Sequence, residues 1–162
     1  MIGSAELRGL LPHRHPMLLV DRVDELVPGE RLVARKAVTA NEPWYEGIPQ
    51  DAPPESYGYP EVLLTESWCQ AAGVLATWES PNPDVLSGRV MLFGGVSDVC
   101  FERPVYPGDV VVHHVRVLRV LTDTMIFEGE ALAGGERVMT VGRATLAFRP
   151  AATLTEAVRA AG

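Results

Sequence analysis

The chain has 162 residues, about the length of one domain, and its 21 acidic and 14 basic residues give it a net charge of −7. With 47% hydrophobic and 22% charged residues, its composition is typical of a globular protein and excludes a disordered one. The negative charge and the absence of a Lys/Arg block argue against a nucleic-acid partner, and the short apolar runs argue against a membrane span. The N-terminus shows no secretory signal pattern, so we expect a cytoplasmic protein. Its single domain is expected over residues 1–149, followed by a C-terminal tail over 150–162.

The first elements expected along the chain are a short helix and a β-hairpin. Residues 4–11 predict the helix, which Pro12 ends. Residues 17–27 and 30–40 are rich in Val and Leu with polar alternation, and the Pro28-Gly29 turn between them predicts a hairpin. Residues 41–60 then contain five prolines and two glycines, which predicts a long loop. Loops of this length in compact domains are usually functional or disordered, and the aromatic residues here argue against disorder.

The segment 61–80 is the clearest predicted helix. Pro60 precedes it, Glu61 suits the positive end of the helix dipole, and Pro81 closes it. Apolar residues cover most of its circumference, and a helix that is apolar on all sides is buried in a core. Glu66 and Gln70 stand out on this helix, because they are polar and lie four residues apart on one face.

Four strand-like runs follow the helix, over residues 89–102, 109–121, 123–133 and 136–149. With the hairpin they predict an antiparallel sheet of about six strands wrapped around one central apolar helix, which is the hotdog arrangement and an α+β fold. Cys69 and Cys100 each lie in an apolar stretch and are expected to be reduced core thiols. His113 and His114 alternate along a strand, so at most one of them points inward.

Four sequence blocks carry a resemblance to a known family. They are LLPHRHPMLLVDRV (10–23), NEP (41–43), LLTESWCQAAGVLA (63–76) and FERPVYPGD (101–109). In this order and spacing they resemble the bacterial 3-hydroxyacyl-acyl-carrier-protein dehydratases, over roughly residues 8–149. The resemblance implies a role in fatty-acid or polyketide biosynthesis, with no cofactor and no metal. It also implies that the partner is an acyl carrier protein bearing a thioester-linked acyl substrate.

The resemblance further implies how the site works. In the family, a loop histidine removes the α-proton, and a carboxylate on the central helix of the other protomer protonates the leaving hydroxyl group. Glu66 falls on that carboxylate and Gln70 on the family's helix glutamine, so these two are the candidate catalytic residues. Substrate contacts are expected from the loop, the helix start and the following strand, at Trp44, Tyr45, Ile48, Tyr59, Glu61 and Gly95.

The base is where this sequence departs from the family pattern. Gly47 is kept, but Ile48 stands where the histidine belongs, and an isoleucine side chain exchanges no proton. For His13 and His15, in the first block, the resemblance implies a packing role. The first hypothesis is therefore a dehydratase-like subunit that forms a heterodimer with a histidine-bearing hotdog homologue. A homodimer of this chain would then be weak or inactive.

Two other hypotheses stay open. The chain could be an enzyme of altered chemistry (a dehydratase, isomerase or thioesterase) whose base comes from residues 49–59. The candidates for that base are Asp51, Glu55, Tyr57 and Tyr59. Alternatively, the chain could be a non-catalytic acyl-binding protein. A buried carboxylate on the central helix weighs against this last hypothesis, because an ionisable group is costly to bury.

Overall fold

The computed structural model describes residues 1–153, and it contains one six-stranded antiparallel sheet and one long helix. The elements in chain order are α1 (Ser4–Leu10), β1 (Arg22–Val27), β2 (Arg31–Ala37), the short turns η1 (Pro43–Tyr45) and η2 (Pro54–Tyr57), α2 (Glu61–Thr77), β3 (Arg89–Phe101), β4 (Val110–Val120), β5 (Thr124–Ala133) and β6 (Glu136–Pro150). The predicted α+β class and strand number are confirmed. Among the described helices, none is both long and apolar enough to cross a membrane.

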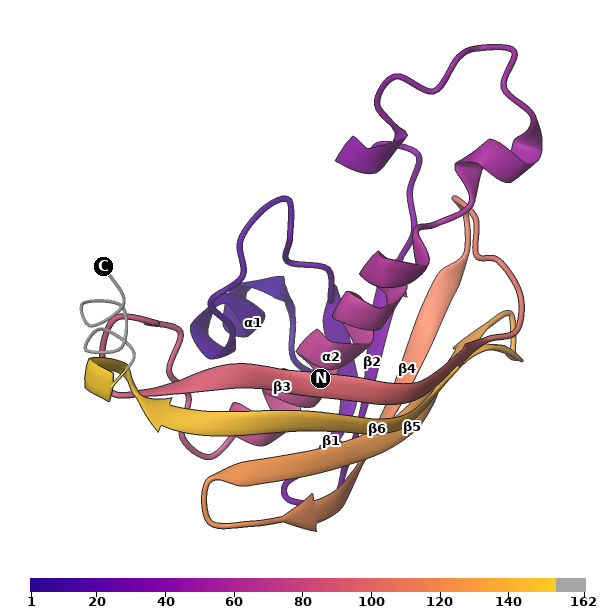
Figure 1. The fold of residues 1–162 in the computed structure, drawn as a ribbon. Helices are drawn as coiled ribbons and strands as arrows, with labels where there is room; N and C mark the ends of the chain where they lie inside the picture. The colour runs from indigo at the N-terminus through magenta and orange to yellow at the C-terminus, as the bar shows by residue number, and fades with distance from the viewer. Residues whose placement is uncertain (154–162) are drawn as a thin grey trace.

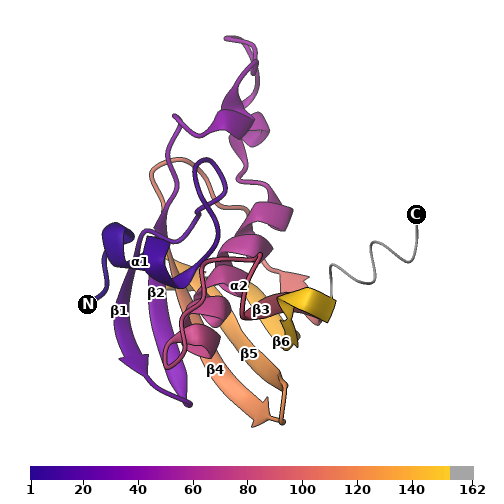
Figure 2. The ribbon, with the colours of Figure 1, turned by 90° about the vertical axis from the view of Figure 1, so that its left-hand side faces the viewer.

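The sheet curves around α2 (Figures 1 and 2). The strand order is β1-β2-β4-β5-β6-β3, so β1 and β3 form the two edges of the sheet. The strand that follows α2 in sequence therefore lies at the far edge from the hairpin that precedes it. This order places α2 against β2, β4, β5 and β6, and residues 67–75 of the helix are buried without a break. The predicted central position of the helix is confirmed.

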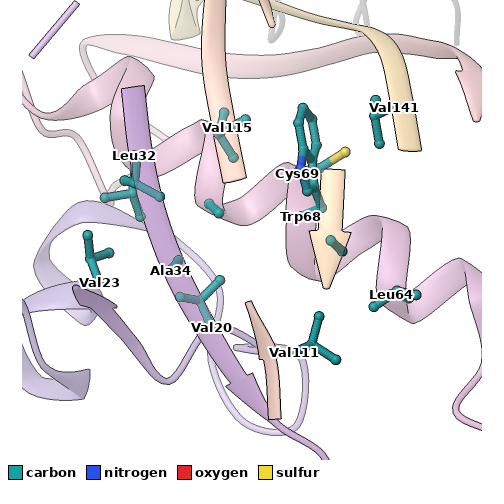
Figure 3. Packing of buried hydrophobic residues seen from close by; sticks show 14 of the residues in the cluster. Val20, Val23, Leu32, Ala34, Leu64, Trp68, Cys69, Val111, Val115 and Val141 are labelled. Atoms are coloured by element: carbon teal, nitrogen blue, oxygen red, sulfur yellow. The ribbon is translucent and has the colours of Figure 1, made fainter. Parts of the chain in front are cut away.

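Trp68 lies at the centre of the core between α2 and the sheet (Figure 3). Its ring is fully buried, and its Nε1–H donates to the carbonyl oxygen of His114 at 3.1 Å. The ring fits there because position 129 on β5 is glycine. A Cβ atom at Gly129 would lie 2.0 Å from the His114 carbonyl oxygen and 3.1 Å from the Trp68 ring. The close packing of helix on sheet therefore depends on a residue without a side chain.

Some predicted boundaries are wrong, and each has a local reason. The first strand begins at Arg22 rather than residue 17, because Met17 and Leu19 bond through their backbone to the Gln70 side chain instead of to a strand. The central helix ends at Thr77 rather than residue 80, and Ser80 N–H bonds back to the Thr77 carbonyl in a tight turn.

The expected burial of the second cysteine is also corrected, and the last strand ends close to the predicted end of the domain. The last strand includes Pro150, and residues 151–153 are helical, so the described fold continues past 149; the remainder of the predicted tail lies outside the described residues. Both cysteines are unpaired, as expected, but only Cys69 is a core thiol. Cys100 is exposed, because it lies on the edge strand β3.

Candidate functional site

Glu66 and Gln70 are in direct contact on α2. They lie one helical turn apart, and the Gln70 Nε2–H donates to Glu66 Oε1 at 2.8 Å. Gln70 is 1% exposed, whereas the Glu66 side chain is 34% exposed. The carboxyl group is therefore held from the interior side by a buried amide and open on the other side. This is a half-buried carboxyl group rather than an enclosed one.

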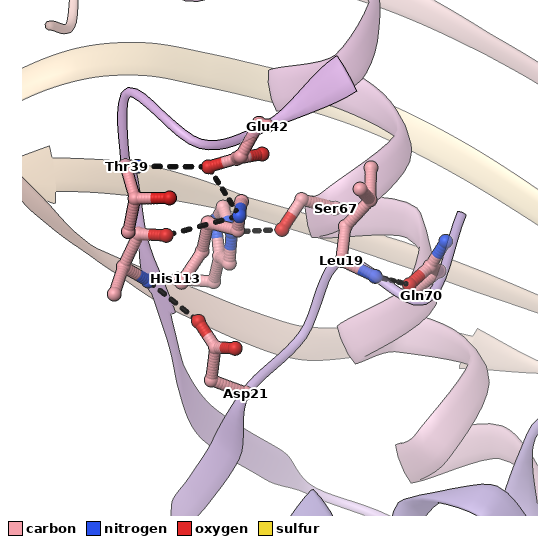
Figure 4. A network of polar contacts seen from close by, with 9 residues as sticks. Leu19, Asp21, Thr39, Glu42, Ser67, Gln70 and His113 are labelled. Carbon is pink, nitrogen blue, oxygen red and sulfur yellow. Dashed lines mark hydrogen bonds and ion pairs between the residues drawn. The ribbon is translucent and has the colours of Figure 1, made fainter. Parts of the chain in front are cut away.

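The hydrogen bonds of Gln70 fix the orientation of its amide group. Its Oε1 accepts the backbone N–H of Leu19 at 2.9 Å, which Figure 4 shows, and its Nε2 donates to the Met17 carbonyl at 2.7 Å. Because a backbone N–H only donates and a carbonyl only accepts, the amide cannot be reversed without losing both bonds. Glu66 Oε1 therefore always faces a donor, and a proton on this carboxyl group resides on Oε2.

His13 also approaches Glu66. Its Nε2 lies 3.3 Å from Glu66 Oε1, and its side chain is 30% exposed. Burial lowers the pKa of His13 below its ordinary value, since desolvation outweighs the opposite pull of the Glu66 charge. The family resemblance implies only a packing role for this histidine. No local pattern indicates the contact, because the two residues lie far apart in the sequence and meet only when the segment after α1 folds onto α2.

Two apolar hollows meet at Glu66. The first, which we call the His13 hollow, has a volume of about 250 Å³ and is lined by Pro12, His13, Glu66, Cys69, Gln70, Met91, Leu92, Phe93 and Leu146. The second, the helix-start hollow, has a volume of about 410 Å³ and is lined by Glu61, Val62, Thr65, Glu66, Cys69, Phe93, Val96, Val99 and Phe101. Both share Glu66, Cys69 and Phe93, so the carboxyl group lies where the two hollows adjoin.

The loop residues expected to contact substrate do not line either hollow of the described chain. Tyr45 and Tyr59 are buried in the core, and Trp44 packs edge-on against Tyr59 with ring centroids 5.8 Å apart. Ile48 and Tyr57 are partly buried against the same cluster. Between Tyr45 and Tyr59 the loop extends away from the sheet and from α2 in both views (Figures 1 and 2). Within the described chain, no residue of the 41–60 loop therefore lines the hollows at Glu66.

The alternative bases in the loop are poorly placed to act on a molecule bound beside Glu66. Asp51 and Glu55 are exposed on the extended part of the loop. Burial raises the pKa of Tyr59 well above its ordinary value, so this phenol does not ionise near neutral pH. Tyr57 lines neither hollow of the described chain. Together these placements argue against a base from residues 49–59 acting within the same chain.

A buried ion pair fixes the start of the loop (Figure 4). Lys36 Nζ lies 2.9 Å from Glu42 Oε1, and the same oxygen accepts the Thr39 backbone N–H at 2.9 Å. Lys36 also lies 5.6 Å from the centroid of the Tyr59 ring, so the pair fixes both ends of the loop. Because Lys36 is 5% exposed, this pair gives the NEP block a structural role.

The two other predicted substrate contacts have different outcomes. Glu61 lines the helix-start hollow at the first turn of α2, where the positive end of the helix dipole lies. Gly95 lies at the irregularity of β3 that follows Phe93 and lines neither hollow of the described chain; its neighbours Phe93 and Val96 do. On this part of β3, the side chains that line the helix-start hollow are therefore those of Phe93 and Val96.

One polar pair in the core was not foreseen. Ser67 Oγ lies 2.8 Å from Nε2 of His113, which is fully buried (Figure 4). Burial lowers the pKa of His113 to about 3, so this imidazole stays neutral. His113 points inward and His114 is exposed, which confirms the expected alternation along β4. Within residues 1–153, no group of three or more His, Cys, Asp or Glu side chains is placed to hold a metal ion.

Comparison with known proteins gives a consistent result. The family model described as a FabA-like domain matches residues 11–142. The chain is 42% identical to the 3-hydroxyacyl-[acyl-carrier-protein] dehydratase FabZ of Nitratidesulfovibrio vulgaris over 144 residues, which cover 86% of this chain and 90% of the relative. It is 39% identical to the protein of the same name from Halorhodospira halophila, covering 83% of this chain and 86% of the relative.

Solved structures with low sequence identity show the fold. The dehydratase heterocomplex ApeI:P from Xenorhabdus doucetiae matches with a TM-score of 0.75 at 18% identity, covering 94% of this chain and 96% of that chain. A hot-dog-like protein from Thermanaerovibrio acidaminovorans matches with a TM-score of 0.62 at 17% identity, covering 82% of this chain and 90% of that one. The predicted hotdog fold is confirmed.

Proposed function

The chain belongs to the family of FabA-like domains, and from this premise we propose that it is a 3-hydroxyacyl-acyl-carrier-protein dehydratase subunit whose acid is Glu66. One observation carries the proposal: the carboxyl group of Glu66 stands at the junction of two apolar hollows with Oε1 held by Gln70. An acid that donates from Oε2 into an apolar passage suits a substrate with one polar centre on an aliphatic chain.

The reaction is the removal of water across C2 and C3 of the acyl group. Glu66 gives the proton on Oε2 to the C3 hydroxyl as the C3–O bond breaks, while a base takes the C2 proton. The first turn of α2, at Glu61 and Val62, faces the helix-start hollow. Backbone N–H groups at that end of the helix would polarise the thioester carbonyl, which makes the C2 proton more acidic.

The family arrangement draws its base from a second chain. Ile48 cannot provide one, so in this arrangement a histidine-bearing hotdog homologue completes the site with its own loop, and Glu66 of this chain supplies the acid. Two features support pairing of chains. The 46–57 part of the loop extends beyond its own domain, and β3 forms a long edge of the sheet beside both hollows.

An edge strand with unpaired backbone groups readily pairs with another strand, which would continue the sheet into the partner chain. The partner in that assembly is either a second copy of this chain or the histidine-bearing homologue. The substrate would arrive as a thioester on an acyl carrier protein, in fatty-acid biosynthesis or in a polyketide pathway.

A complementation assay tests the proposal. The FabZ relative from Nitratidesulfovibrio vulgaris is prepared with its own helix carboxylate replaced by glutamine, so that it contributes no acid. Mixed with this chain, it should form 2-enoyl thioester from a 3-hydroxyacyl thioester of acyl carrier protein. The gain should disappear with Glu66→Gln and persist with Glu79→Gln, an exposed glutamate beyond the end of α2. Equal turnover with Glu66→Gln would contradict the role of Glu66.

A further inference from the structure

His13 gives this chain a histidine at Glu66 without a partner. Resting on the proposed dehydratase function, we propose that His13 is the catalytic base of this chain and replaces the loop histidine that Ile48 displaces. The family arrangement brings histidine and carboxylate together across two chains. Here, one chain places His13 Nε2 3.3 Å from Glu66 Oε1, and both side chains line the His13 hollow.

The segment that carries His13 is fixed on both sides. On the N-terminal side, the guanidinium of the next residue, Arg14, reaches back and donates to the carbonyls of Leu11 at 2.8 Å and Arg8 at 3.1 Å. These bonds fasten the segment to the end of α1. On the C-terminal side, the Gln70 amide bonds Met17 and Leu19, which fastens the segment to α2. Two sets of hydrogen bonds from side chains to the backbone therefore hold the segment that places the imidazole next to Glu66.

Gln70 links the acid to the base. The same amide that orients Glu66 also holds the backbone that follows His13, so both groups keep one relative geometry. The surroundings of His13 lower its pKa, so the imidazole is free to accept a proton. Of the charged groups near it, Glu66 raises its pKa and Arg14 lowers it, and desolvation is larger than either. The net result is an imidazole that is neutral, and hence basic, at neutral pH.

The proton balance of the reaction closes within the pair. Neutral His13 takes the C2 proton, and the electrons of that bond form the C2–C3 double bond. The C3–O bond breaks, its electron pair stays on oxygen, and the oxygen takes the Oε2 proton of Glu66 and leaves as water. The site then holds an imidazolium and a carboxylate in contact. A proton then passes from His13 Nε2 through the released water to Glu66 Oε2, which restores the starting state without another reactant.

The other side chains of the His13 hollow fit this role. Apart from His13, Glu66 and Gln70, they are mainly apolar, and they include Met91, Leu92 and Leu146 of the sheet. Cys69 is the other titratable group there, and burial raises its pKa to about 12, so the thiol does not compete as a base. An aliphatic acyl chain is the ligand that such a lining accepts.

The test uses the purified chain alone with a 3-hydroxybutyryl thioester of N-acetylcysteamine, and follows the ultraviolet absorbance of the conjugated product. The wild-type chain should form product, and His13→Ala should lower the rate by roughly 100-fold or more, as loss of a general base does. Free imidazole should restore part of the rate of His13→Ala but none of the rate of Glu66→Gln. The matched control is His15→Gln, which replaces an exposed histidine of the same block and should leave the rate unchanged.

Each outcome decides the proposal. If His13→Ala does not fold, His13→Gln replaces it in the assay. This variant keeps a hydrogen-bonding side chain beside Glu66 and should show the same loss of rate. Wild-type rates in either folded variant would overturn the role of His13. So would a wild-type chain that is inactive alone but active in the complementation mixture, and the dehydratase function would then stand. Inactivity in both assays would remove the proposed function itself.

Discussion

Replacing Gln70 by leucine tests the bonds that build the site. The two side chains have similar volumes, so little cavity forms, but three hydrogen bonds are lost. Leu19 is 2% exposed, so its N–H is left without a partner away from water, at a cost of ~1–3 kcal/mol. Met17 is 39% exposed and Glu66 is half-buried, so water replaces the other two bonds at little cost. We expect the free energy of unfolding to fall by about 2 kcal/mol.

Urea unfolding measures this loss. With a slope of ~2 kcal/mol per molar urea, the midpoint should fall by about 1 M. The control is Val62→Ala on the same helix, which is 75% exposed and should change the free energy of unfolding by less than ~0.5 kcal/mol. A second variant, Gln70→Glu, keeps an acceptor for Leu19 but places a second carboxylate beside Glu66, and it should be at least as unstable near neutral pH. If Gln70→Leu leaves the midpoint unchanged, the amide does not fasten the N-terminal segment, and the reasoning about Glu66 and His13 loses its support.

Three further predictions concern the core. His113 stays neutral when folded, with a pKa of about 3, but takes a proton near pH 6.5 when unfolded, so stability should fall by up to ~1.4 kcal/mol per pH unit as the pH drops from 6.5 towards 3. The urea midpoint of His113→Gln should therefore depend less steeply on pH in that window. An unchanged dependence would exclude His113 as the source of the loss of stability. Lys36→Met should cost ~3–5 kcal/mol by leaving Glu42 unpaired. The double variant Lys36→Met/Glu42→Gln should be more stable than Lys36→Met alone, and strict additivity in a double-mutant cycle would argue against coupling. Gly129→Ala should lower the free energy of unfolding by ~1–3 kcal/mol or more in thermal unfolding, because its Cβ would overlap the His114 carbonyl, and a tolerated alanine would contradict the described packing.

The elements of the fold were predictable because their signals are local. The apolar circumference of α2 predicted its burial, and strand alternation predicted that at most one of His113 and His114 faces inward. The contact of Glu66 with Gln70 follows from helix geometry alone, since residues four apart share a face. Each of these conclusions needs only a few consecutive residues.

What the sequence did not indicate depends on contacts between distant segments. The first strand starts late because the Gln70 side chain takes the backbone groups of Met17 and Leu19. His13 meets Glu66 only because the same amide and Arg14 hold its segment in place. The direction of the 41–60 loop is likewise set by the Lys36 ion pair and by tertiary packing, which no periodicity encodes.

The most direct test of the account is the rate at which this chain dehydrates a 3-hydroxyacyl thioester on acyl carrier protein, compared with the rate of Glu66→Gln. Both proteins are assayed alone and with the acid-deficient FabZ relative, after their circular dichroism spectra are shown to match. The account predicts formation of 2-enoyl thioester by the wild type and a loss of ~10²-fold or more in Glu66→Gln under both conditions. Equal rates for the two proteins, or no product under either condition, would contradict it.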